Sequence, residues 1–202
     1  MASTSSPEID TSEQLYHTAQ HYIHQVLQLL ETSVTSDSHL QHTSNRSAGS
    51  TLGKHLRHLH DHYRLLLDSV SPPPSSPSSA SSPPPAPLRV NYDVRSRNGD
   101  AENHHGACVE SFRHLSERLE TETRAGRAIP SNRKVLLTAV TPERVVVEST
   151  WGRELWFASF HAVHHFALIR VILGELGLEV GDDFGVAPST LVHRNELTPN
   201  KL

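Results

Sequence analysis

The chain has 202 residues, with 18 Lys and Arg against 22 Asp and Glu and a formal net charge of −4. That length suits one domain, and the mild negative charge argues against a nucleic-acid-binding protein, which would carry a basic surplus. The 36% hydrophobic content is low for a globular domain, so we expect part of the chain not to pack. The single cysteine excludes an internal disulfide framework and fits a reducing compartment.

The two ends of the chain bear on its location. The first ten residues are polar and lack the charged and apolar regions of a signal peptide. No apolar run approaches the ~20 residues required to span a bilayer. The last residues, Asn200-Lys201-Leu202, differ from the peroxisomal signal Ser-Lys-Leu at the first position. We therefore expect a cytoplasmic protein without membrane or nucleic-acid partners, with a peroxisomal location as the alternative.

Four amphipathic helices are expected where apolar residues recur at steps of three and four. They span about residues 11–32, 51–69, 100–124 and 150–176. Ser50 or Thr51 would cap the second helix, and Gly177 would stop the last one. β-Branched residues on both sides of a Thr141-Pro142-Glu143 turn predict a small hairpin within 134–150. The expected fold class is all-α, a four-helix bundle with a small β-hairpin before the last bundle helix.

Composition divides the chain further. Segment 71–87 holds eight of the 13 prolines and no charge, which predicts a semi-extended linker inserted in the bundle. We expect residues 1–10 to be a disordered tail, 11–176 the bundle, and 177–202 a tail that packs back on it. The apolar stretch Phe184–Leu191 of that tail would form a lid over the site. The proline-rich segment alternatively predicts an interaction module recognised by an SH3 or WW domain.

Histidines gather on two of the expected helices. They are His55, His58, His60 and His62 on one, and His161, His164 and His165 on the other. Because positions i and i+4 share a helix face, His161 and His165 both fall on the apolar stripe. Buried imidazoles need partners, and one shared metal ion would satisfy both. The second helix would supply the third ligand, but its geometry alone does not choose among His55, His58 and His62.

The run Thr51-Leu52-Gly53, followed by His58, Leu59 and Asp61, resembles the second-helix signature of the DinB/YfiT-like proteins. The resemblance implies a four-helix bundle with a three-His metal site. It identifies His58 as the ligand from this helix, with His161 and His165 matching the His-x-x-x-His pair of the last helix. It also implies a thiol cosubstrate, as in characterised relatives, and a homodimer.

A three-His site leaves one coordination position open, which is typical of catalytic metal sites. Zn suits such a site best, with Ni, Fe or Mn as alternatives. We therefore expect a metal-dependent transferase or hydrolase that activates a thiol or water for attack on a small-molecule substrate. The alternative is a non-catalytic metal-binding or interaction protein.

Several other side chains are weaker candidates. Asp61 would orient a neighbouring histidine or remain a solvated carboxylate. Tyr92, Arg95 and Arg97 would hold an anionic substrate or simply form a charged loop. Cys108 falls on an apolar stripe and is expected in the core rather than as a nucleophile.

Overall fold

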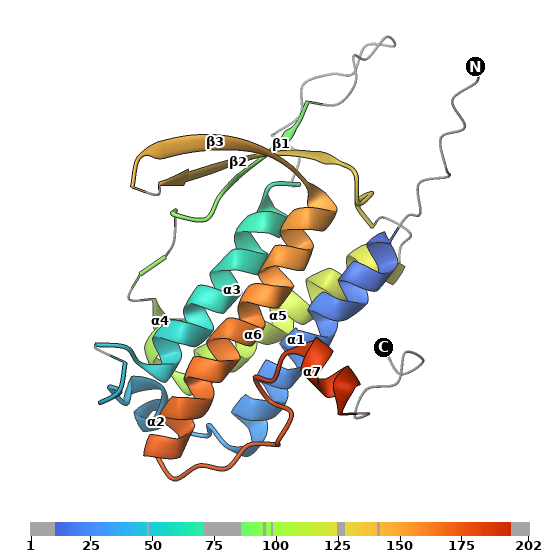
Figure 1. Cartoon of the computed structure of the whole chain (residues 1–202). Helices are drawn as coiled ribbons and strands as arrows, with labels where there is room; N and C mark the ends of the chain where they lie inside the picture. The colour runs from blue at the N-terminus through green and yellow to red at the C-terminus, as the bar shows by residue number, and fades with distance from the viewer. Residues whose placement is uncertain are drawn as a thin grey trace, which may run out of the picture.

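The computed structural model describes residues 11–47, 49–70, 86–94, 96–97, 99–124, 128–140 and 142–194. Its framework is a bundle of four long helices (Figure 1). They are α1 (Ser12–Thr32), α3 (Leu52–Asp68), α5 (His105–Arg124) and α6 (Trp151–Glu175). α1 packs on α5 and α6, and α3 packs on the same two helices. Most of the proline-rich segment, 71–85, lies outside the described residues, so its expected role as a linker stays a prediction.

A three-stranded sheet lies across one end of the bundle (Figure 1). β1 (Leu88–Asn91) pairs in parallel with β2 (Lys134–Val140), and β2 pairs antiparallel with β3 (Arg144–Thr150). The antiparallel pair is the expected hairpin, although Thr141 of its turn lies outside the described residues. The sequence pattern did not predict β1. The expected all-α class is therefore wrong, because the helices are joined by a mixed parallel and antiparallel sheet.

Local chemistry fixes the ends of the two helices that carry the histidines. Thr51 is the N-cap of α3, and its hydroxyl accepts a hydrogen bond from the Lys54 amide at 3.1 Å. α6 ends in a Schellman motif, in which the Leu178 amide donates to the Leu173 carbonyl at 2.9 Å. Gly177 lies between them with φ +67°, a conformation that glycine adopts without strain.

The expected third helix is broken in two. α4 (Asp100–Asn103) is a single turn, and α5 starts only at His105 because His104 is extended, with φ −118° and ψ 120°. Asp37, the first residue of α2 (Asp37–Gln41), stabilises this break. Its carboxylate accepts from the His105 amide at 2.7 Å and lies 3.1 Å from Nδ1 of His104. A carboxylate at a helix N-terminus is favourable, so the contact sets where α5 begins.

α6 is the central helix of the molecule. By length and apolar composition it could cross a membrane, but half of its most apolar window is buried inside the protein. Trp151, Leu155, Phe166 and Ile169 on this helix are all fully buried. A helix that is apolar nearly all round is what the middle of a bundle requires.

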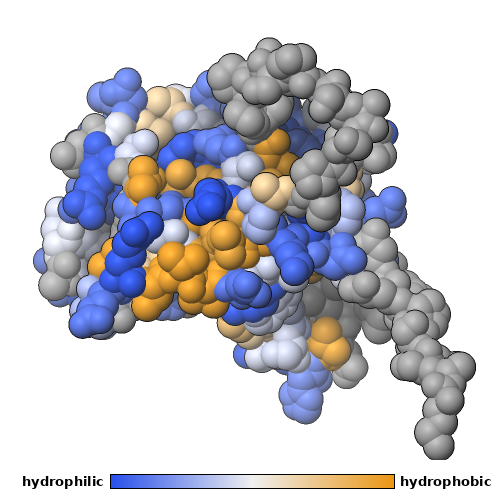
Figure 2. Space-filling model, turned by 90° about the horizontal axis from the view of Figure 1, so that it is seen from above, coloured by the Kyte–Doolittle hydropathy of each residue, from blue (hydrophilic) through white to orange (hydrophobic). Residues whose placement is uncertain are grey.

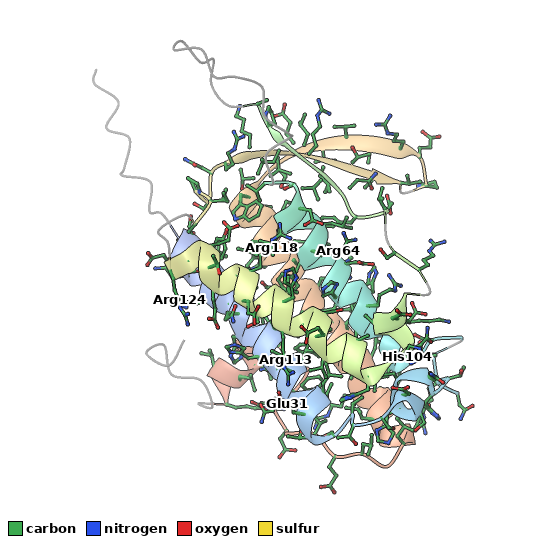
Figure 3. The ribbon with its side chains drawn as sticks, turned by 180° about the vertical axis from the view of Figure 1, so that it is seen from behind. Glu31, Arg64, His104, Arg113, Arg118 and Arg124 are labelled. Atoms are coloured by element: carbon green, nitrogen blue, oxygen red, sulfur yellow. The ribbon has the colours of Figure 1, made fainter. Side chains whose placement is uncertain are left out.

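Charged residues hold the outer face of α5 to its neighbours (Figure 3). Arg113 lies 3.5 Å from Glu31 of α1, and Arg118 donates to Asp68 of α3 at 2.5 Å. Arg64 also donates to Asp68, at 3.0 Å. These pairs are in contact with solvent, so each contributes at most ~1 kcal/mol to stability.

Candidate metal centre

Histidines from α3 and α6 meet where these two helices pack together. Nε2 of His161 lies 3.1 Å from Nε2 of His58 and 3.1 Å from Nε2 of His165. One ligand atom each from His58, His62 and His161 lies within 4.8 Å of the others. The structure thus brings together all three predicted ligands, and it adds His62, which the helical geometry had left as an alternative.

These distances suit a shared ion. Two nitrogens bound to one tetrahedral zinc at ~2.1 Å lie about 3.4 Å apart. The observed 3.1 Å separations are close to that value, and they also fit N–H···N hydrogen bonds. The spacing of the donor atoms in the cluster is therefore close to that of a metal site.

Hydrogen bonds orient the rings toward one another. Nδ1 of His62 donates to the His58 carbonyl at 2.9 Å, which places the lone pair of His62 on Nε2. Nδ1 of His165 lies 2.9 Å from Nδ1 of His55, whose Nε2 lies 2.7 Å from the Ser50 hydroxyl. In the tautomer of His165 with its proton on Nδ1, His165 donates to His55 and its Nε2 carries the lone pair. Such outer contacts commonly fix the ring and tautomer of a metal ligand.

Burial favours the neutral form of two imidazoles of the cluster, His161 and His165. Burial is the main cause that lowers the pKa of His161 to about 4, with further lowering by His62 and His164. Burial likewise lowers the pKa of His165 to about 2. Neutral imidazole is the form that binds a metal, so both rings are ready to ligate at pH 7.

Tyr92 closes one side of the cluster. Its ring stacks on His62 at 4.8 Å between centroids, with an angle of 16° between the planes. Its hydroxyl donates to Glu154 at 3.0 Å, and Glu154, which is buried, also accepts from Ser149. The tyrosine predicted to hold an anion instead packs against a histidine and bonds a carboxylate. Arg95 lies outside the described residues, and Arg97 is exposed.

Asp61 does not orient a histidine. It is buried, and its carboxylate accepts from Arg57 at 2.9 Å and from Arg64 at 3.2 Å. Arg57 also donates to Glu102 at 2.9 Å. The expected role of Asp61 is replaced by an ion-pair network that ties α3 to α4.

The structure also places His60, Cys108 and the C-terminal tail. The ring of His60 meets Phe112 edge to face at 5.4 Å, and burial lowers the pKa of His60 to about 4. Cys108 is buried, and burial raises the pKa of its thiol to about 12, so it is a core residue. The tail stacks Phe184 on Phe166 at 4.5 Å. Gly185, Val186 and Leu191 of the tail line a groove between α1 and α6, so the tail is not a lid over the histidines.

Comparisons with known proteins do not support the resemblance to DinB/YfiT-like proteins. No family model matches the chain. A curated relative is FK506-binding protein 5 of Rhizopus delemar, which is 38% identical over 104 residues. The match covers 52% of this chain and 27% of the relative, so it spans about a quarter of the relative's length. No solved structure matches.

The assignment to the DinB-like proteins is therefore wrong, and so is the metal-dependent transferase or hydrolase inferred from it. FK506-binding protein 5 of Rhizopus delemar carries a different name, one that denotes binding. The structure also gives the signature residues ordinary local roles. Thr51 caps a helix, Gly53 packs against the backbone of Glu102, and Asp61 forms ion pairs. A short motif of such residues is therefore weak evidence for a family.

Proposed function

We propose that the chain has a binding function, and that it holds one divalent transition-metal ion in the histidine cluster between α3 and α6. His161 is a central ligand because its Nε2 lies 3.1 Å from Nε2 of both His58 and His165. His58 is the other, because it also belongs with His161 to the group of three histidines whose ligand atoms lie within 4.8 Å of one another. His165 and His62 flank them. The separation of 3.1 Å between Nε2 atoms across two helices is the observation that carries the proposal.

The donor set supports storage or structural binding rather than turnover. Four imidazoles lie in or beside the cluster, and the compact group contains no carboxylate or thiol. A tetrahedral ion that recruits four protein ligands keeps no open position, which is the arrangement of non-catalytic sites. Nitrogen-only ligands favour Zn, with Ni, Fe or Mn as the alternatives.

Calorimetric titration of the metal-free protein with Zn²⁺ tests the proposal. The wild type is expected to bind one equivalent, and His58→Gln or His161→Gln to weaken binding at least a hundredfold, since each removes a central ligand. His55→Gln should weaken it about ten- to a hundredfold, the usual effect of losing an outer partner. His62→Gln and His165→Gln should each weaken binding as well, because each removes one of the four proposed ligands.

His17→Gln is the matched control, because His17 is exposed on α1. It should bind like the wild type. Several weak ions per chain, lost equally in the control, would refute a defined site and indicate surface histidines alone.

FK506 binding is the second candidate, favoured by the name of the relative and by an aromatic groove. Trp156 and Phe160 are about half exposed on α6 and stack at 5.3 Å beside a cavity of about 220 Å³ between α1, α6 and α7 (Pro188–His193). Pockets that enclose drug-sized ligands are larger, ~300–1,000 Å³, so this groove would hold only part of FK506. Titration with FK506 while following tryptophan fluorescence tests it. A saturable change that Phe160→Ala removes supports binding, and an unchanged spectrum refutes it.

A further inference from the structure

β3 leaves an apolar edge of the sheet open. It is the last strand in the order β1-β2-β3, and among the described residues only β2 pairs with it. Val145, Val146 and Val147 follow one another in this strand and are 40%, 57% and 48% exposed. Apolar side chains are also visible on the face of the molecule that carries the sheet (Figure 2). Proteins normally protect such an edge with charge, proline or a partner.

We propose that β3 pairs antiparallel with β3 of a second copy of this chain, which makes one continuous six-stranded sheet. The strand reads Arg144-Val145-Val146-Val147-Glu148, and its charges are symmetric about Val146. A two-fold axis at Val146 places Arg144 of each copy opposite Glu148 of the other. It places Val145 opposite Val147 and Val146 opposite itself. Both ends of the contact then carry an opposite-charge pair, with valine between them.

The neighbouring registers lack this match. An axis at Val147 sets Val146 against Glu148 and Arg144 against Thr150. An axis at Val145 sets Arg144 against Val146 and Glu143 against Val147. Directly opposed side chains in an antiparallel pair contact one another, so opposite charges stabilise the register and an apolar–charged pair does not. Charge complementarity thus selects a second copy as partner and Val146 as the centre.

The faces of the strands agree as well. Alternate residues of a β-strand point to opposite sides of its sheet, so Val145 and Val147 of β3 share one side and Val146 lies on the other. Pairing about Val146 sets even-numbered residues opposite even-numbered ones. The face that carries Arg144, Val146 and Glu148 therefore continues across the junction. This inference does not depend on metal binding.

Sedimentation equilibrium with charge variants tests the proposal. The wild type is expected to form a dimer, and Arg144→Glu to raise its dissociation constant at least tenfold, because two attractive pairs become two like-charge pairs. The swap Arg144→Glu/Glu148→Arg restores both pairs and should restore the dimer. Both side chains are exposed, so folding is retained, and circular dichroism confirms it for each variant.

Lys134→Glu is the matched control. It makes the same change of charge at an exposed position on the neighbouring strand, away from the open edge, and should leave the dimer unchanged. Two results would overturn the proposal. One is a wild type that stays monomeric at protein concentrations up to about 100 μM, and the other is a dimer that Arg144→Glu does not weaken.

Discussion

Gly53 is the position at which the smallest change should damage the fold most. It lies in the first turn of α3, where that helix meets the end of α4. A Cβ atom there would lie 1.9 Å from the carbonyl oxygen of Glu102 and 3.3 Å from that of Leu40. Both neighbours are backbone atoms, so no side-chain rotation relieves the contact.

The expected loss follows from two opposing effects. Moving α3 or α4 by more than 1 Å to make room is overpacking, which costs about 1–3 kcal/mol and more where backbone must shift. It also strains the pair between Arg57 and Glu102, which join the same two helices. The intrinsic helical preference of Ala over Gly returns up to ~1 kcal/mol. We expect Gly53→Ala to lower the free energy of unfolding by about 2–3 kcal/mol and Tm by about 5–10 °C.

Urea unfolding followed by circular dichroism measures this loss. Gly174→Ala is the matched control, since it makes the same change within α6 and a Cβ atom there meets nothing within 4 Å. The control should be neutral or stabilising by ~0.5–1 kcal/mol. Equal stability of Gly53→Ala and the wild type, or equal loss in both variants, would refute the reasoning from close packing.

Three further predictions concern buried polar groups. The Cys108 thiol, whose pKa burial raises to about 12, should not react with Ellman's reagent in the native protein and should react at once in urea; rapid native reaction would contradict its burial. The folded state lowers the pKa of His161 to about 4 and that of His165 to about 2, so the unfolded chain binds more protons below pH ~6.5. The free energy of unfolding of the metal-free protein should then fall by about 1–2 kcal/mol between pH 7 and pH 5, a value discounted for partial exposure of the two rings. A His161→Asn/His165→Asn variant should show a smaller change of unfolding free energy over the same pH range. Asp61→Asn leaves Arg57 with only Glu102 and should lower the free energy of unfolding by about 2 kcal/mol; an unchanged urea midpoint would contradict the ion-pair network.

The long helices were predictable because their apolar periodicity is strong. The Thr51 cap and the Gly177 stop are local signals, and the structure confirms both. The break at His104 was not predictable, because it depends on Asp37, which is 67 residues away in sequence and accepts from the chain at the break. Helix ends set by such tertiary contacts leave no local pattern.

β1 shows a different limit of sequence reasoning. Its four residues include one buried side chain, Val90, and its partner β2 lies more than 40 residues later. A strand so short gives almost no periodicity. Its one signal was the apolar Leu88 and Val90 at a spacing of two, directly after the proline-rich segment.

Only part of the histidine cluster could be predicted from the sequence. The i, i+4 spacing of His161 and His165 correctly places both rings toward α3, where His165 contacts His55 and His161 contacts His58. The position of His62 depends on how α3 is rotated against α6, which the apolar stripe defines only coarsely. The family resemblance failed because residues that cap, pack and pair within a helix are common in unrelated proteins.

Metal analysis of protein purified without a His-tag tests the central claim most directly. After dialysis against trace zinc, the wild type should retain about one equivalent of metal, and a His58→Gln/His161→Gln/His165→Gln variant should retain none while keeping the helical circular dichroism spectrum. A folded wild type that retains no metal, or a triple variant that retains as much as the wild type, would contradict the assignment of a metal ion to this cluster.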